Sequence, residues 1–319
     1  MPRARPRIRV IYRSYGVENS KERPTYFSKA LALRSLLRAV DVAGCEVTFL
    51  NDGPVSDEIA GLMDGRGEII TLPRVGLFPS LTAAMRLPLD RGWTDEDVVY
   101  FCEDDYLHTP DALVCLQEAA EALTAEYLAL YAALPAERAA GRPEDPTHRE
   151  PRGWKSAEYC VGEQRWMRVL TTTSTFGVRV GALRKDMAIV RQAKLPHKNM
   201  YRDWDVGLVY QGYRPYRWAD LGRDLMMRTT GSLVQRLRTV VLVPFKAAMN
   251  LRSLRRPANR HTLMAASPNL ATHLESAYLA SGRDWEEVAR ATTAQSPGPT
   301  SPASEEKVAR VSRPDLRVL

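Results

Sequence analysis

The sequence has few cysteines and no long apolar run, and each absence excludes a class of protein. Only four of its 319 residues are Cys, and none lies in a CxxC spacing. A disulfide framework or a zinc site of paired cysteines is therefore not expected. No stretch approaches the roughly 18 apolar residues of a spanning helix, and the basic N-terminus precedes an apolar run too short for a signal peptide. We expect a cytoplasmic protein, with peripheral contact at the inner face of the membrane as an open alternative.

Two further absences concern phosphate loops and acidic residues. No Gly-rich loop follows the first apolar run and no G-K-[ST] motif occurs, which argues strongly against a P-loop enzyme. From residue 225 to 260 there is no Asp or Glu, whereas eight cations stand there: Arg228, Arg236, Arg238, Lys246, Arg252, Arg255, Arg256 and Arg260. With a net charge of +7 and a pI near 9.3, the chain favours an anionic partner. Charge alone leaves open a nucleotide, a phosphorylated substrate, nucleic acid or an acidic membrane.

Short apolar runs alternate with segments of helical periodicity through the first half of the chain. Expected strands cover 8–12, 46–50, 69–72 and 98–102, and expected helices cover 26–42, 56–63, 80–87 and 109–126, the last with Thr109 as its N-cap. Such alternation is typical of βαβ units. The sequence predicts an α/β protein, Rossmann-like, with a mostly parallel mixed sheet.

Three consecutive carboxylates, Glu103, Asp104 and Asp105, end the fourth expected strand. A buried strand keeps no unpaired acids in its interior, so they belong at its carboxyl end, where open parallel sheets bind ligands. Side chains two apart on extended chain point the same way, which pairs Glu103 with Asp105 as in a DxD-type metal site. A solvated acidic turn before a helix is the open alternative.

Four stretches in order carry a family resemblance: Tyr12-Arg13 at the end of the first strand, Asn51-Asp52-Gly53 at the end of the second, Glu103-Asp104-Asp105, and Arg202-Asp203-Trp204-Asp205. Over residues 7–215 the chain resembles the bacterial, non-processive family 2 glycosyltransferases of the GT-A fold. The resemblance implies a GT-A domain over 1–222 (nucleotide-binding half 7–130, acceptor half 131–222). Charge and composition predict a basic helical C-terminal segment over 223–293 packed on it, and a disordered tail over 294–319, rich in Ser, Pro, Thr and Gly.

The resemblance also implies roles for single residues. Asp52 would bind the nucleoside base, and Glu103 and Asp105 would bind Mn²⁺ or Mg²⁺ and the diphosphate of a nucleotide sugar. Asp203, with Asp205 in the same motif, would supply the catalytic base of a single, inverting sugar transfer to an acceptor hydroxyl. Further donor contacts are expected from Tyr12, Arg13 and Asp104, and His273 is expected as a third metal ligand.

The motifs depart from the family pattern at two places, and each residue has another explanation. Glu103 stands where the family has Asp, and Arg202 where it has Glu. Asp203 could be a first-turn acid of a helix, Asp52 suits any tight turn before Gly, and a lone His273 is often a surface residue. A Mg²⁺-dependent nucleotidyltransferase and a basic module without enzymatic activity, binding nucleic acid or membrane, stay open as alternatives.

The basic stretch 225–260 also contains apolar residues at helical spacing, which predicts contact with a membrane or a polyanionic acceptor. We expect two amphipathic pieces, because Pro244 should interrupt a single helix. In the alternative interpretation, the apolar residues close the back of the sheet while the arginines face water.

Overall fold

The computed structural model describes residues 6–17, 20–134, 150–193, 202–228 and 231–294. The expected tail thus lies outside the described residues, apart from its first position. The strands of the main sheet are β1 (Ile8–Tyr15), β2 (Glu46–Asp52), β3 (Glu68–Leu72), β4 (Val98–Glu103), β6 (Tyr127–Ala129), β7 (Glu158–Val161), β8 (Gln164–Arg168), β9 (Phe176–Arg179) and β10 (Leu263–Ser267). Two short strands, β5 (Tyr106–His108) and β11 (Ala271–His273), pair separately.

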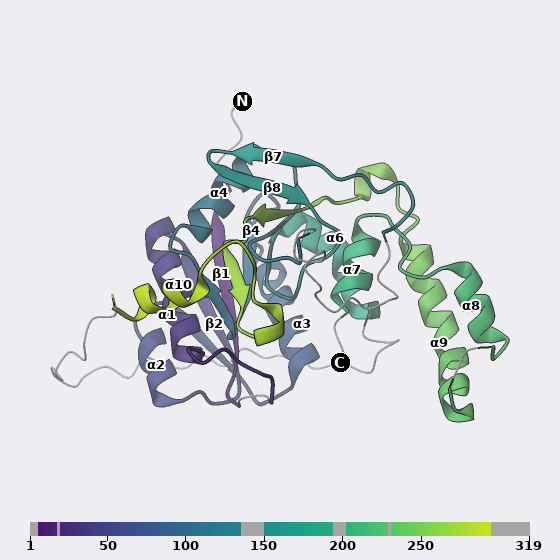
Figure 1. Ribbon diagram of the computed structural model, residues 1–319, viewed down its shortest axis with the longest axis horizontal. Helices are drawn as coiled ribbons and strands as arrows, with labels where there is room; N and C mark the ends of the chain where they lie inside the picture. The colour runs from purple at the N-terminus through teal and green to yellow at the C-terminus, as the bar shows by residue number, and fades with distance from the viewer. Residues whose placement is uncertain (1–5, 18–19, 135–149, 194–201, 229–230, 295–319) are drawn as a thin grey trace.

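Helices follow most strands in the first half and dominate parts of the second. They are α1 (Lys29–Ala43), α2 (Asp57–Met63), α3 (Leu77–Asp90), α4 (Ala112–Ala122), α6 (Val180–Ala193), α7 (Asp203–Tyr210), α8 (Trp218–Leu225), α9 (Leu233–Arg252) and α10 (Trp285–Ala294). Figure 1 shows the helices on both faces of the sheet, with α8 and α9 projecting away from the body.

The nine-stranded sheet has the order β3-β2-β1-β4-β9-β6-β10-β8-β7. The pairings make all strands run in one direction except β9 and β8, which are antiparallel to their neighbours. The predicted class, an α/β protein with a mostly parallel mixed sheet and helices near the C-terminal end, is confirmed. Among the described residues, no helix is long and apolar enough to cross a bilayer.

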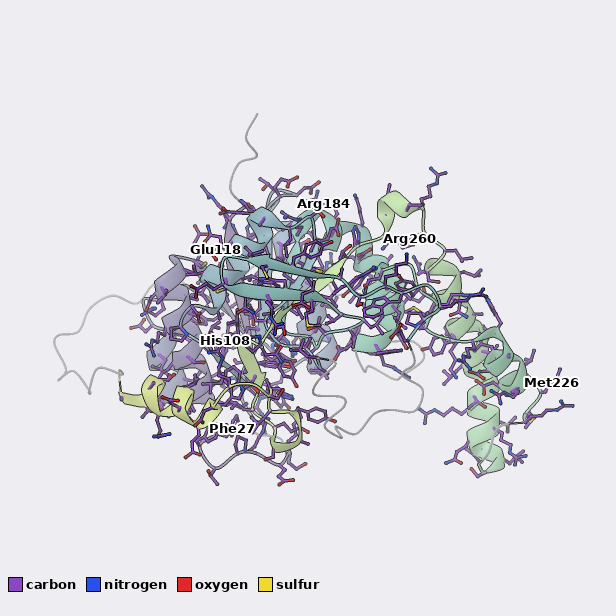
Figure 2. All side chains as sticks on the ribbon, turned by 45° about the horizontal axis from the view of Figure 1, so that its top comes forward. Phe27, His108, Glu118, Arg184, Met226 and Arg260 are labelled. Atoms are coloured by element: carbon purple, nitrogen blue, oxygen red, sulfur yellow. The ribbon has the colours of Figure 1, made fainter. Side chains whose placement is uncertain are left out.

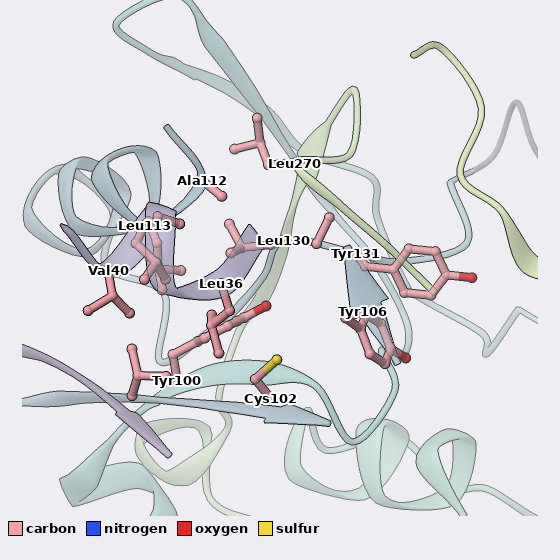
Figure 3. Packing of buried hydrophobic residues seen from close by; sticks show 14 of the residues in the cluster. Leu36, Val40, Tyr100, Cys102, Tyr106, Ala112, Leu113, Leu130, Tyr131 and Leu270 are labelled. Atoms are coloured by element: carbon pink, nitrogen blue, oxygen red, sulfur yellow. The ribbon is translucent and has the colours of Figure 1, made fainter. Parts of the chain in front are cut away.

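Both faces of the sheet are covered, which explains why its strands read as continuous apolar runs. On one face Tyr12 and Tyr100 pack against Leu36 of α1 and Leu113 of α4, as Figure 3 shows for part of this cluster. On the other face, neighbouring strand residues such as Ile11 and Phe101 meet α3, α6 and α7. This two-sided burial holds the carboxyl ends of β1, β2 and β4 in fixed positions.

Two predicted helix starts differ from the structure. Thr109 is no N-cap, because its hydroxyl donates to the carbonyl of Leu270, and α4 begins only at Ala112. Helix α3 begins at Leu77 and takes Pro79 into its first turn, where a missing N–H costs nothing. In both cases a contact to another element, or a tolerated proline, moved the boundary by a few residues.

The expectation that Pro244 divides the basic segment into two helices is wrong. Helix α9 runs unbroken from Leu233 to Arg252 with Pro244 inside it. A capping box between Ser232 and Gln235 secures its N-terminus, with the Ser232 hydroxyl accepting from the Gln235 N–H at 3.3 Å. Pro244 removes one backbone hydrogen bond, and the turns before and after it keep theirs.

The segment 223–293 was expected to be helical, and the structure divides it differently. After α9 the chain returns to the sheet as β10, which lies between β6 and β8, and then pairs β11 with β5. Leu263–Ser267 is fully buried. Its Leu-Met-Ala-Ala-Ser sequence has high helix propensity, so the strand exists because of burial between its neighbours.

Candidate functional site

The predicted acidic cluster lies at the carboxyl edge of the sheet, where three parallel strands end together. The pairing register sets Arg13 of β1 beside Glu103 of β4, and Tyr15 of β1 beside Asp52 of β2. Because parallel strands end at the same edge, residues nearly a hundred positions apart become neighbours.

Asp105 forms the centre of the cluster. Its side chain is buried, and its Oδ2 lies 3.0 Å from His273 Nε2, 3.0 Å from Arg23 Nη2 and 3.8 Å from Lys21 Nζ. The pairing of β11 with β5 brings His273 to this place, since it aligns His273 with Tyr106. The two rings stack with centroids 4.9 Å apart. His273 thus lies beside Asp105, and its expected role as a third metal ligand stays a prediction.

The surroundings of Asp105 decide its charge. Burial acts to raise the pKa of the carboxyl, but the hydrogen bond and charge of His273, together with Lys21 and Arg23, hold that pKa well below its ordinary value. Asp105 therefore stays ionised across the physiological range. An ionised carboxylate beside an imidazole and two cations can hold a metal ion or bind to an anion through its cationic neighbours.

The other two acids of the cluster face different partners. Glu103 pairs with the Arg13 guanidinium, which also donates to the Ser80 hydroxyl at 3.2 Å. Asp104 pairs with Lys29 at 2.8 Å and accepts the backbone N–H of Tyr15 at 2.9 Å. Burial raises the pKa of Asp104, and Lys29 opposes this effect. The chain turns directly after Glu103, so the three acids face different partners and the expected pairing of Glu103 with Asp105 by extended-chain alternation is not observed.

Asp203 lies on the first turn of α7 and lines a small cavity. Its other lining residues come from α7 itself, from the loop before β9 and from strands β6 and β9: Gly207, Tyr210, Thr172, Thr173, Tyr127 and Phe176. A side chain at Gly207 would meet the Leu170 carbonyl at 2.7 Å, so glycine permits this close approach of α7 to the loop. The loop touches the acidic cluster, because the Tyr106 hydroxyl donates to the Thr173 hydroxyl at 2.8 Å.

The pKa of Asp203 is raised well above its ordinary value, first by burial and then by the negative charge of Glu103. Of the acids that end β4, Glu103 is therefore the one whose charge acts on Asp203. A carboxyl with a raised pKa binds a proton more strongly than usual once it is ionised, which suits a general base.

Asp205 lies on the same turn but faces another way. It is buried, accepts the hydroxyl of Tyr216 and lies 3.4 Å from Arg202 Nε. These contacts tie α7 to the chain before α8. A catalytic role for Asp205 stays a prediction, and its observed contacts are those of a structural residue.

Asp52 and Tyr12, which were predicted to contact the donor, are both buried and contact other parts of the protein. Asp52 is buried, and its two oxygens accept the backbone N–H groups of Val75 at 2.6 Å and Gly76 at 2.8 Å. Tyr12 is buried in the core with its ring edge-on to Phe49, centroids 6.1 Å apart. Their roles in binding a nucleoside stay predictions, and the structure shows Asp52 organising the loop before α3.

Two of the three expected metal ligands lie side by side, and the metal itself stays a prediction. Asp105 and His273 supply a carboxylate and an imidazole at one place, a donor set that Mn²⁺ accepts. Glu103, the third expected ligand, faces Arg13 instead. No group of three or more His, Cys, Asp or Glu residues in the described part of the chain is placed to hold a metal ion. The residues fit a metal held by two protein ligands and by oxygens of a bound molecule.

Several residues of the site escaped the sequence reasoning. Lys21 and Arg23, from the connection between β1 and α1, and Lys29, the first residue of α1, pair with Asp105 or Asp104. Their signal was available, because a loop that follows the first strand of a parallel sheet must lie at its carboxyl edge. Tyr106 and Thr173 gave no signal, since only the three-dimensional structure joins them.

Comparisons with known proteins were made by family, sequence and structure. No protein-family model and no curated protein sequence matches the chain. Staphylococcus aureus TarS 1-349 in complex with UDP-GlcNAc is similar in structure, with a TM-score of 0.39 and 14% identity over 63% of this chain and 52% of that one. The chain thus spans about half the length of this TarS structure.

Two other solved structures are similar to a comparable degree. The apo-form glycosyltransferase GlyE of Streptococcus pneumoniae TIGR4 has a TM-score of 0.35 and 13% identity, over 91% of this chain and 64% of that one. A 4-diphosphocytidyl-2C-methyl-D-erythritol synthase has a TM-score of 0.36 and 10% identity, over 62% and 83%. At such TM-scores these likenesses place the chain in no family, and its function has to be argued from the site.

Proposed function

We propose that the protein is a metal-dependent glycosyltransferase that moves one sugar from a nucleotide-diphosphate sugar to an acceptor hydroxyl with inversion. One observation carries this proposal. An ionised Asp105 with His273 and two cations lies at the carboxyl edge of a parallel sheet, and Asp203 shares the electrostatic environment of the same acidic cluster. Asp105, His273 and the two cations suit the binding of a diphosphate, and Asp203 suits the role of proton acceptor.

The cations of the site would bind the donor. Transfer from a nucleotide sugar leaves negative charge on the departing diphosphate, and Arg13, Lys21 and Arg23, which pair with Glu103 or Asp105, would neutralise it. Asp105 and His273 would hold Mn²⁺ or Mg²⁺, which when bound offsets the charge of the diphosphate. Glu103 as a third ligand, and Tyr12, Asp52 and Asp104 as donor contacts, remain part of the proposal.

Asp203 would take the proton of the acceptor hydroxyl as it attacks the sugar. An inverting transfer needs a base on the side of the sugar opposite to the leaving group, and such catalysis contributes about 10²–10⁴-fold. The raised pKa of Asp203 and its position in a small cavity support this role.

A nucleotidyltransferase is the second candidate, because cations and carboxylates at a sheet edge would equally bind a nucleoside triphosphate. That reaction would use Asp105 and its cationic neighbours to bind the nucleotide. It would not need Asp203 as a base for an acceptor hydroxyl. The products separate the two candidates: a glycosyltransferase releases a nucleoside diphosphate, and a nucleotidyltransferase releases pyrophosphate.

A thermal-shift panel tests the class of ligand. UDP, GDP, dTDP and CDP are added with and without Mn²⁺, and one diphosphate is expected to raise the melting temperature in a metal-dependent way. Asp105→Asn should abolish that shift while keeping a folded protein. Asn is preferred to Ala because Asp105 is buried and pairs with Arg23, which Ala would leave beside a void.

A matched control is Asp186→Asn, since Asp186 is also buried and pairs with an arginine, Arg255 at 2.6 Å, but lies outside the acidic cluster. This variant should lose stability and keep the full ligand-induced shift. An Asp105→Asn protein that still binds a diphosphate in a Mn²⁺-dependent way would contradict the metal site.

A further inference from the structure

Helices α8 and α9 form a projection whose apolar residues are not covered by the protein. On α9, Leu233 is 66%, Val234 76%, Leu237 50% and Val241 64% exposed. We call these four residues the α9 stripe. Figure 1 shows the projection extending from the body of the molecule, and Figure 2 places the exposed Met226 at its outer side. A folded protein seldom leaves several large aliphatic side chains together in water without a partner.

The α9 stripe lies on one side of its helix, since its positions follow i, i+1, i+4 and i+8. The other side holds the protein together. Lys246 pairs with Asp224 of α8 at 3.0 Å, and the Asn250 side chain exchanges two hydrogen bonds with the backbone of Tyr216. The interpretation that these apolar residues close the back of the sheet is therefore wrong for the α9 stripe.

Cations also lie on the same projection, four of them on α9. Residues 225–260 contain eight cations and no acid. Arg236 and Arg238 follow the stripe residues closely in sequence and lie on the two flanks of the stripe by helical geometry. Long arginine side chains at such positions can extend their charged ends past an apolar surface to reach anions.

The exposed α9 stripe and its flanking arginines together favour one kind of partner. A second copy of the chain would bring the same arginines against one another, and like charges in contact oppose association. A polyanion such as nucleic acid would neutralise the arginines and leave the aliphatic residues in water. An anionic bilayer satisfies both features, because its headgroups attract the arginines and its acyl region takes up the aliphatic side chains.

We propose that the α8–α9 projection docks on an anionic lipid surface, with the α9 stripe inserted at the boundary between headgroups and acyl chains. Helix α9 lies in the plane of the surface, since it carries four cations along its length and is not apolar enough to span. Each nearby arginine adds to the attraction, which makes the attachment reversible and sensitive to salt. This inference goes beyond the proposed sugar transfer and does not depend on it.

Vesicle flotation with the full chain tests the proposal. At low salt, recovery with phosphatidylglycerol-containing vesicles is expected to exceed recovery with phosphatidylcholine vesicles by about tenfold or more. Two double variants should each reduce that recovery to the neutral-vesicle level: Leu237→Ser with Val241→Ser, and Arg236→Glu with Arg238→Glu. These positions are exposed or half-buried on α9, so folding, followed by circular dichroism, should be unchanged.

The matched control combines Val42→Ser on α1 with Lys185→Glu on α6, an exposed aliphatic residue and an exposed cation elsewhere. It should float like the unchanged protein.

Equal recovery of the unchanged protein with neutral and with phosphatidylglycerol-containing vesicles overturns the proposal. So does full recovery of the serine variant when only the glutamate variant fails, since that pattern marks a polyanion site. A concentration-dependent dimer that the serine variant abolishes marks a second copy as the partner. Asp105→Asn should float normally, which separates this proposal from the enzymatic one.

Discussion

Asp203 occupies a place in α7 that disfavours its own charge. Because its folded-state pKa lies above the ordinary value of 3.8, the folded protein keeps this proton to higher pH than the unfolded chain does. The free energy of unfolding then falls as pH rises through that interval. We therefore expect the ionised form of Asp203 to lower the stability of the fold, which is common where a group serves catalysis.

Replacing this acid by its amide should separate function from stability. Asp203→Asn is expected to raise the melting temperature near pH 7 by a few degrees, because it removes a charge that burial and Glu103 disfavour. If Asp203 is the base, kcat should fall by about 10²-fold or more while donor affinity is kept. Calorimetry and single-turnover kinetics measure the two effects.

Asp205→Asn is the matched control on the same turn. It weakens the contacts with Tyr216 and Arg202, so it should lower the melting temperature and spare the chemical step of the folded enzyme. If the two variants lose donor binding and turnover to the same extent, Asp203 is structural.

The pH dependence of the rate follows from the same carboxyl. A base must be ionised to act, so kcat is expected to rise with pH, with its midpoint above the range in which an ordinary aspartate titrates. Glu103→Gln removes the negative charge that contributes to the raised pKa, and the midpoint should move to lower pH. A pH profile of kcat under saturating donor measures both midpoints, and an unmoved midpoint in the variant would separate Glu103 from Asp203.

How far the sequence predicts this site depends on the kind of information each residue carries. Glu103 and Asp105 follow a buried strand directly, so their place at the edge could be read from local pattern. The actual partner of Glu103 could not, because it depends on the register of β1 against β4. Arg23 lies in the loop after β1, which must run along the carboxyl edge of the sheet, but its pairing with Asp105 is visible only in the folded chain.

The helices and strands also differ in how far the sequence predicts them. Strand β4 was recognised because its apolar run is continuous and covered on both faces. Strand β10 was missed because its sequence favours a helix and only its neighbours β6 and β8 make it a strand. Helix α9 was recognised in kind but predicted to break, since the effect of one proline was given more weight than the hydrogen bonds on either side of it.

Helix α9 should become more stable when its proline is replaced. Pro244 lies on an exposed position inside the helix, where proline is about 3 kcal/mol less favourable than alanine. Pro244→Ala is therefore expected to raise the free energy of unfolding and the helical circular dichroism signal. Urea denaturation gives the size of the change.

Ser232→Ala serves as the opposite control on the same helix, because it removes the capping box with Gln235 and should cost about 0.5–2 kcal/mol. An unchanged stability in both variants would mean that α9 unfolds independently of the transition that is measured.

At the scale of the whole molecule, the boundary predicted at residue 222 can be tested by truncation. A chain of residues 1–222 lacks β10, which leaves the edges of β6 and β8 without their shared neighbour. We expect no cooperative unfolding transition in urea for this fragment, because a sheet interrupted in this way loses both its pairing and the burial of Leu263 and Met264.

The comparison for this experiment is a chain of residues 1–294, which keeps every described element. It should unfold cooperatively with the stability of the full chain. A folded and equally stable 1–222 fragment would instead support an independent catalytic domain.

The late position of β10 in the sequence also determines when the main sheet can be completed during translation. Ribosomes add about 5–20 residues per second, so β6 and β8 leave the exit tunnel several seconds before the strand that belongs between them. His273 follows later still, and with it the completed Asp105 cluster. A nascent chain of this protein therefore lacks both the complete sheet and the Asp105–His273 contact until residue 273 has emerged, and a chain released early presents an open sheet edge that chaperones and proteases can recognise.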